Sequence, residues 1–282
     1  MTWRYIKDRL MLVIASVLGL LLLIPIVGMV WLVLSKAMPA LNLQMLTQVT
    51  QGTGGGLANA IVGTFYVVGL GLLIAAPLGI AAGVFLGEIA PSSRFSAVVR
   101  FTTDVLAGVP SIVIGYFGYV TMVLGLGWGF STLAGAIALA LIGIPYVVRS
   151  TEIALSKVPR GMREASMALG APLTTTVWRV SLRSAAPGVL TGVLLALSLA
   201  LGETAPLLYT AGITNTLPSA SLIHQPIAYL TYYVWTDYNQ PIKSTQYLSF
   251  DAALILVVLV LALLVVSRVL VNRTQRHAEG RR

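Results

Sequence analysis

The sequence contains no cysteine, two histidines and few charged residues, and each shortage excludes a class of protein. Without cysteine the chain cannot form the disulfides on which many small secreted domains depend. Charged residues make up 10% of the 282 positions, against about 25% in soluble globular proteins, so they are too few to cover a surface that faces water. The hydrophobic content of 57% instead indicates a protein embedded in a membrane.

The residues that catalysis needs are also scarce. His224 and His277 both fall in polar segments, so we expect no histidine-based metal site or nucleophile inside the membrane. No Gly-Lys dipeptide occurs, which excludes the P-loop that binds ATP. We therefore expect no catalytic residue, no metal site and no cofactor in this chain.

Long apolar runs recur along the sequence. A membrane-spanning helix needs about 20 consecutive apolar residues, and the runs predict six such helices, at residues 10–35, 57–87, 105–128, 132–155, 185–208 and 250–271. The first run is longer than the 7–15 apolar residues of a secretory signal. We therefore expect it to be retained as a transmembrane helix.

The positive charges predict how these helices are oriented. Sixteen of the 18 lysines and arginines fall in four clusters, at residues 4–9, 94–100, 149–183 and 268–282. Cytoplasmic segments carry an excess of positive charge, so we expect both termini, residues 1–9 and 273–282, to be cytoplasmic. Membrane topology thus accounts for the net charge of +9, and we expect no nucleic-acid partner.

Small residues recur within two of the apolar runs. Gly79, Gly83 and Gly87 are spaced by four residues, as are Gly188 and Gly192. This spacing lets helix backbones approach each other closely. The sequence leaves open whether the contact is made within this chain or with another subunit.

The longest predicted cytoplasmic loop, residues 156–183, carries the most informative pattern. Helix-forming residues run from Arg163 to Leu169, and Gly170 is a natural helix end. A second short helix is predicted from Thr174 to Leu182, after Pro172. Met162, Ala165 and Leu169 form one apolar stripe, which favours docking of a soluble partner, although a helix lying on the lipid surface remains an alternative.

The loop also resembles the coupling motif of bacterial ABC importer permeases. The resemblance rests on Glu164, Ala165, Ser166 and Gly170, with Val180 and Leu182 further on. Ser166 stands where alanine is usual in the family, and Arg183 where proline is usual. Two more runs, Gly-Val-Pro-Ser-Ile-Val-Ile-Gly at 108–115 and Gly-Glu-Thr-Ala-Pro-Leu-Leu at 202–208, resemble those of phosphate-specific permeases of the PstA type.

This resemblance implies an all-α membrane protein with the type I ABC importer permease fold. The permease domain would occupy residues 57–272, with six transmembrane helices in the whole chain and a cytoplasmic coupling helix-turn-helix. Glu164, Ala165, Ser166 and Gly170 would contact the ATPase. Permeases of other oxyanion importers, for molybdate or sulfate, and a stand-alone secondary transporter remain alternatives.

The resemblance also implies a set of partners in the bacterial inner membrane. They are a second, homologous permease of the PstC type, two copies of an ATP-binding subunit that holds the nucleotide, and a phosphate-binding protein outside. Membrane lipid surrounds the assembly.

Three ionisable residues are predicted within or near the bilayer, where such groups are costly and mark functional sites. Arg149 can bind a tetrahedral oxyanion through paired N–H donors, and Glu152 lies on the same helix face. Arg149 could equally extend to the cytoplasmic interface with Glu152 as its partner. Glu203, the third substrate-path candidate, lies between Gly202 and Pro206. Because a carboxylate repels phosphate, we expect its side chain to make a structural hydrogen bond, to the backbone or to the partner permease.

Overall fold

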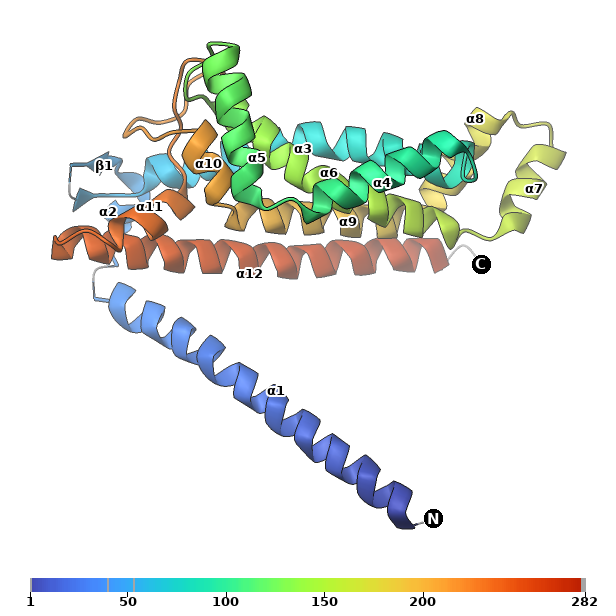
Figure 1. The fold of residues 1–282 in the computed structure, drawn as a ribbon, viewed down its shortest axis with the longest axis horizontal. Helices are drawn as coiled ribbons and strands as arrows, with labels where there is room; N and C mark the ends of the chain where they lie inside the picture. The colour runs from blue at the N-terminus through green and yellow to red at the C-terminus, as the bar shows by residue number, and fades with distance from the viewer. Residues whose placement is uncertain (1, 40, 53, 280–282) are drawn as a thin grey trace.

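A computed structural model describes residues 2–39, 41–52 and 54–279, and it is almost entirely helical (Figure 1). The elements are α1 (Thr2–Ala37), α2 (Leu43–Thr47), β1 (Thr50–Gln51), β2 (Gly54–Gly55), α3 (Ala58–Val84), η1 (Phe85–Ile89), α4 (Arg94–Gly108), α5 (Ser111–Gly118), η2 (Tyr119–Gly125), α6 (Thr132–Ser156), α7 (Arg160–Ala168), α8 (Leu173–Thr175), η3 (Thr176–Ser181), α9 (Leu182–Gly202), α10 (Ala205–Thr210), α11 (Leu230–Asp237) and α12 (Lys243–Glu279). The segments η1, η2 and η3 are π-helical and continue the helices before them.

Four long helices, α3, α6, α9 and α12, form the body of the molecule (Figure 1). α6 packs against both α3 and α9, and α12 packs against α9. The largest buried cluster includes Val67 of α3, Leu139 of α6 and Leu201 of α9, together with Ile227 from the segment before α11. The helices are thus held by an apolar core of their own.

Glycines bring α3 and α9 close to α6. A Cβ added at Gly79 would lie 2.6 Å from the Cβ of Val147, and one added at Gly188 would lie 2.6 Å from the Cβ of Ala154. Both distances are shorter than a real contact, so a side chain at either position would separate the helices. The predicted glycine spacing therefore serves packing within the chain.

α1 leaves this body and runs away from it (Figure 1). Its main contact within the described chain is with α12. The apolar segment Lys7–Ala37 has no buried residue in its most hydrophobic window. Its apolar surface must therefore be covered by lipid or by another protein.

Five described helices are long and apolar enough to cross a membrane: Lys7–Ala37, Ala58–Ile89, Thr132–Ser156, Leu173–Gly202 and Lys243–Val271. A sixth span requires α4 and α5 to be taken together, although their axes bend by 99°. The prediction of one helix over residues 105–128 was therefore wrong. Pro110 explains the bend, because its ring forces Val109 into an extended conformation (φ −73°, ψ 128°).

The positive cluster at residues 94–100 is helical. It is the start of α4, and the hydroxyl of Ser93 caps this helix by accepting a hydrogen bond from the Ser96 N–H.

The predicted boundaries of the fifth span were wrong at both ends. The second coupling helix is not separate, because α8, η3 and α9 form one helix over Leu173–Gly202. That helix ends at Gly202, not at 208, and Glu203 adopts an extended conformation (φ −72°, ψ 131°). Pro206 supplies the reason, since it has no N–H to donate to the carbonyl of residue 202.

A compact cap closes the end of the body opposite to α7. It consists of α2, the β1–β2 hairpin and α11. α2 and α11 pack apolar side chains against the starts of α3 and α12, and β2 contacts α12. Asn59 joins three of these parts: it accepts a hydrogen bond from the Thr50 N–H and donates to the Tyr233 hydroxyl, each at 3.1 Å. Asp237 lies buried at the end of α11, and this burial raises its carboxyl pKa to about 6.

Candidate functional site

The predicted coupling loop forms a knob, residues 160–181, that projects from one end of the body (Figure 1). α7 ends where Gly170 adopts a φ of +84°, in the left-handed region that favours glycine. The Gly170 N–H donates to the carbonyl of Met167 at 2.9 Å, and the Ala171 N–H donates to that of Ser166 at 3.2 Å. The prediction that the loop turns at Gly170 is thus confirmed.

The two arms of the knob are held together by hydroxyl groups, and its outer surface carries an apolar stripe. Ser166 Oγ lies 2.9 Å from Thr176 Oγ1, across the turn. Leu169 is 90% exposed, Met162 is also exposed, and Glu164 and Ala165 lie exposed on the same short helix. An apolar stripe in this position is typical of a surface that a partner covers.

Arg163 fastens the knob to the body of the molecule. Its Nε lies 3.0 and 2.9 Å from the two carboxylate oxygens of Glu88, at the end of η1. Its two terminal nitrogens donate to the carbonyls of Leu155, at 2.8 Å, and Val158, at 2.9 Å. Glu88 is almost fully buried. One guanidinium therefore ties α7 to the ends of both α3 and α6.

A second ionic cluster lies beside the first. Arg100 of α4 donates through Nε to Glu152 at 2.7 Å, and it also donates to the carbonyls of Leu86 and Pro91. Arg149 approaches the other oxygen of Glu152 at 3.3 Å. Two guanidiniums thus share one carboxylate, and they differ in exposure: the Arg149 side chain is 58% exposed and that of Arg100 is 30% exposed.

Glu203 lies apart from these clusters, in the break between α9 and α10. Its main-chain carbonyl accepts a hydrogen bond from the Thr231 hydroxyl at 2.9 Å. In the part of the chain that the structure describes, its carboxylate forms no ion pair. This main-chain contact does not test the structural hydrogen bond expected of the Glu203 side chain, and that role stays a prediction.

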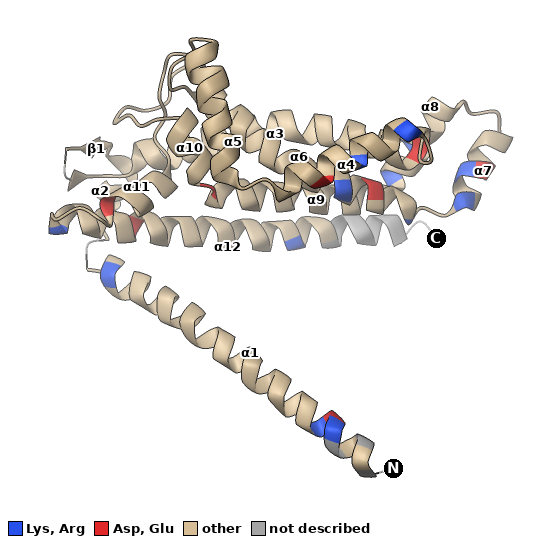
Figure 2. Ribbon diagram, viewed as in Figure 1, with Lys and Arg blue, Asp and Glu red and all other residues tan. Residues whose placement is uncertain are grey.

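Charged residues gather at the end of the body that carries the knob, as Figure 2 shows. Sequence reasoning paired Arg149 with Glu152, and the structure brings them together. It did not find the partners Arg100 and Glu88, because 52 and 75 residues separate them from Glu152 and Arg163. Each lies at the edge of an apolar run, which places it near the membrane surface but does not indicate its partner.

Comparison with known proteins places the chain in a family. The model of the family described as "Binding-protein-dependent transport system inner membrane component" matches residues 79–277. The chain is 46% identical over 246 residues, 87% of its length and 81% of the relative's, to the "Phosphate transport system permease protein PstA 2" of Mycobacterium bovis. It is 39% identical over 274 residues to PstA of Haemophilus influenzae, with 94% of both chains covered.

The fold has solved counterparts. An inward-facing structure of the MetNI methionine ABC transporter has a chain that superposes with a TM-score of 0.62 at 19% identity, covering 83% of this chain and 99% of that one. At this identity the likeness shows the fold, and the fold is that of an ABC importer permease. The chain belongs to the family of binding-protein-dependent transport system inner membrane components, and is a multi-pass membrane permease subunit of an ABC importer.

Proposed function

We propose that this chain is the PstA-type membrane subunit of an ATP-driven phosphate importer, and that Arg149 binds the transported anion. The names and extent of the relatives support phosphate as the substrate. One observation carries the role of Arg149: its exposed guanidinium faces a carboxylate that already has a second, less exposed arginine as partner.

This arrangement suits an anion that must bind and then leave. Phosphate carries one to two negative charges at neutral pH, and removing its water is strongly unfavourable without compensating donors. The Arg149 guanidinium offers a fork of N–H donors to a tetrahedral oxyanion. Because Arg100 remains on Glu152, Arg149 can turn to phosphate without leaving that carboxylate unpaired.

The chain itself carries no ATP-hydrolysing group in this proposal. ATP is bound and hydrolysed by two copies of a separate subunit, which dock on the knob through Glu164, Ala165, Ser166 and Gly170. Arg163 then transmits the movement of α7 to the ends of α3 and α6, since it contacts both. The exposed apolar stripe of Met162 and Leu169 supports this assignment.

The two ends of the molecule and its exposed apolar surface are assigned to different surroundings and partners in this proposal. The basic end, with both termini, faces the cytoplasm, and residues 57–272 form the permease domain. The opposite end, with the cap, receives phosphate from its binding protein. A homologous permease of the PstC type covers apolar surface that the body leaves exposed, and lipid covers the rest.

Uptake of radiolabelled phosphate tests this proposal. Cells that lack the chain should lose uptake, and cells that express it again should recover it. Unchanged phosphate uptake in cells that lack the chain, with loss of labelled molybdate or sulfate uptake, would assign another oxyanion. Uptake that persists when the partner ATPase is inactivated would instead favour the stand-alone secondary transporter.

A further inference from the structure

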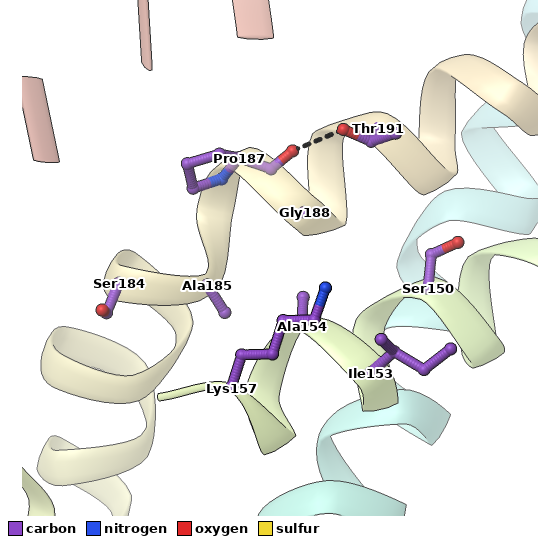
Figure 3. A pocket seen from close by; sticks show the side chains of 9 residues that line it. All are labelled: Ser150, Ile153, Ala154, Lys157, Ser184, Ala185, Pro187, Gly188 and Thr191. Carbon is purple, nitrogen blue, oxygen red and sulfur yellow. Dashed lines mark hydrogen bonds between the residues drawn. The ribbon is translucent and has the colours of Figure 1, made fainter. Parts of the chain in front are cut away.

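A groove of about 490 Å³ lies between the C-terminal half of α6 and the N-terminal half of α9 (Figure 3). Its volume is in the range of small-molecule sites, about 300–1,000 Å³. Gly188 and Ala154 lie among its lining residues, and the close approach of Gly188 to Ala154 brings the two helices together there. Because the side chains at this contact are small, they leave the groove between α6 and α9 unfilled.

The polar groups of the groove are donors. Lys157 extends its side chain from the end of α6 into the space between the two helices, as Figure 3 shows. Hydroxyls are contributed by Ser150, Ser184 and Thr191, and none of the described residues that line the groove is acidic. Within the described part of the chain, the Lys157 ammonium forms no ion pair.

The hydroxyls differ in what they can offer. The Thr191 hydroxyl already donates to the carbonyl of Pro187 at 2.8 Å, as the dashed line in Figure 3 marks. The hydroxyls of Ser150 and Ser184 make no hydrogen bond with described residues, so their protons remain available.

Ser150 and Ser184 lie at opposite ends of the groove (Figure 3), because Ser150 packs on Gly192, about 12 Å along α9 from Ser184. The Lys157 ammonium points toward the Ser150 end. An ammonium and a free hydroxyl, with no carboxylate among the described lining residues, suit the oxygens of an anion.

The groove continues the face that carries Arg149. At 100° per residue, Lys157 lies roughly 80° around α6 from Arg149 and about 12 Å further along the helix. Ile153 lies between them on this face and is exposed. An anion that leaves Arg149 toward the knob end thus meets Lys157 next.

We propose that this groove is a binding site for a phosphate group, held by the Lys157 ammonium and the hydroxyl of Ser150. Two sources share this chemistry. One is the transported phosphate, and this source rests on the function proposed above. The other is the headgroup of an anionic lipid, since basic pockets between transmembrane helices bind such headgroups.

The test uses the complete transporter, purified with its partner subunits and placed in nanodiscs. In discs of phosphatidylcholine alone, equilibrium binding of radiolabelled inorganic phosphate is measured. In discs that also contain phosphatidylglycerol, the amount of this lipid that remains bound after purification is measured by mass spectrometry. Lys157→Gln removes the charge, and Arg268→Gln on α12 removes one positive charge at the same end, away from the groove.

The Lys157→Gln variant should bind either inorganic phosphate or phosphatidylglycerol about tenfold more weakly, because a charge-assisted hydrogen bond is lost. Lys157→Arg should retain most of the binding, which separates loss of the site from misfolding. Loss of phosphate binding assigns the groove to the transported anion, and loss of phosphatidylglycerol alone assigns it to lipid. Equal values for Lys157→Gln and Arg268→Gln in both measurements would overturn the proposal. The lipid measurement does not depend on transport. The proposal for the groove can therefore be contradicted while phosphate uptake is normal, and it can be supported while uptake is absent.

Discussion

Arg163 and Glu88 are 75 residues apart in the sequence, yet their side chains form a forked ion pair that joins the knob to the end of α3. The pair is largely shielded from solvent, with Glu88 5% exposed and Arg163 19% exposed. Removing one partner of a buried pair leaves an uncompensated charge, which costs about 3–5 kcal/mol. The position of α7 therefore depends on this contact.

We expect Arg163→Ala to lower transport-coupled ATP hydrolysis at least tenfold, because α7 loses its attachment to the body. Arg163→Lys should retain part of the coupling, since an ammonium keeps the charge but not the fork. ATP hydrolysis by the reconstituted transporter is the measurement, with Arg94→Ala as a control that removes an exposed charge near the same end. Equal coupling in Arg163→Ala and Arg94→Ala would contradict this role.

Gly170→Val should abolish coupling while the protein still inserts, because valine is strained at a φ of +84°. Gly170→Asn should be milder, since asparagine tolerates this conformation. Gly161→Ala on α7 is the matched control: a Cβ there meets no atom within 4 Å, and alanine suits a helix better than glycine. Coupled ATP hydrolysis distinguishes these variants, and normal coupling in Gly170→Val would favour a loop that lies on lipid.

Arg149→Ala should lose phosphate uptake, while the complex still assembles and hydrolyses ATP. Arg149→Lys should restore uptake in part, because an ammonium lacks the bidentate geometry. Uptake is compared at matched protein levels, and Arg100→Lys serves as a control that keeps the second charge beside Glu152. Wild-type uptake in Arg149→Ala would show that the anion relies on residues of the partner permease.

A cysteine placed at Asn215 should react with a membrane-impermeant thiol reagent in intact cells, and one placed at Ser156 should not. Both positions are exposed, and the native chain has no cysteine to give a background. Labelling of Ser156→Cys from outside would contradict the proposed orientation.

Asp237 should make the stability of the cap depend on pH. Burial raises its pKa from 3.8 to about 6 in the folded protein, so the folded state binds the proton more tightly than the unfolded state. The contribution of Asp237 to the free energy of unfolding is therefore greatest below about pH 4, and it is lost as the pH rises through about 6. The loss is at most about 3 kcal/mol, from two pKa units.

The Asp237→Asn variant should remove this pH dependence and raise the melting temperature of the purified complex at pH 7. The exposed Asp104→Asn is the control. An unchanged pH dependence in Asp237→Asn would show that other groups cause it.

Sequence reasoning predicted the helices whose boundaries are set locally. The fourth span, predicted at 132–155, is observed at Thr132–Ser156, because Ser131 caps its start and a polar segment follows its end. The turn at Gly170 was also predictable, since a left-handed residue at a helix end favours glycine. The roles of Arg149, Glu152 and Glu203 in the substrate path, and those of Glu164, Ala165 and Ser166 in docking, stay predictions.

Sequence reasoning missed two breaks inside apolar runs and the contacts between distant segments. The bend at Pro110 and the break at Glu203 both occur inside apolar runs, where composition gives no boundary. Pro77, Pro145 and Pro187 lie inside continuous helices, so a proline alone does not mark a break. Likewise, nothing in the local pattern around Glu88 indicates that Arg163 will reach it.

The uninterrupted course of Leu173–Gly202 gives the molecule a lever. Thirty residues of helix measure about 45 Å, which exceeds the roughly 30 Å hydrocarbon thickness of a bilayer. One end of this rod belongs to the knob and the other ends at Glu203, while Gly188 and Gly192 hold its middle against α6. If the rod pivots on these glycines, a tilt of about 5° moves each end by about 2 Å in opposite directions. A small push on the knob would therefore shift the break at Glu203 without any change in the helix itself.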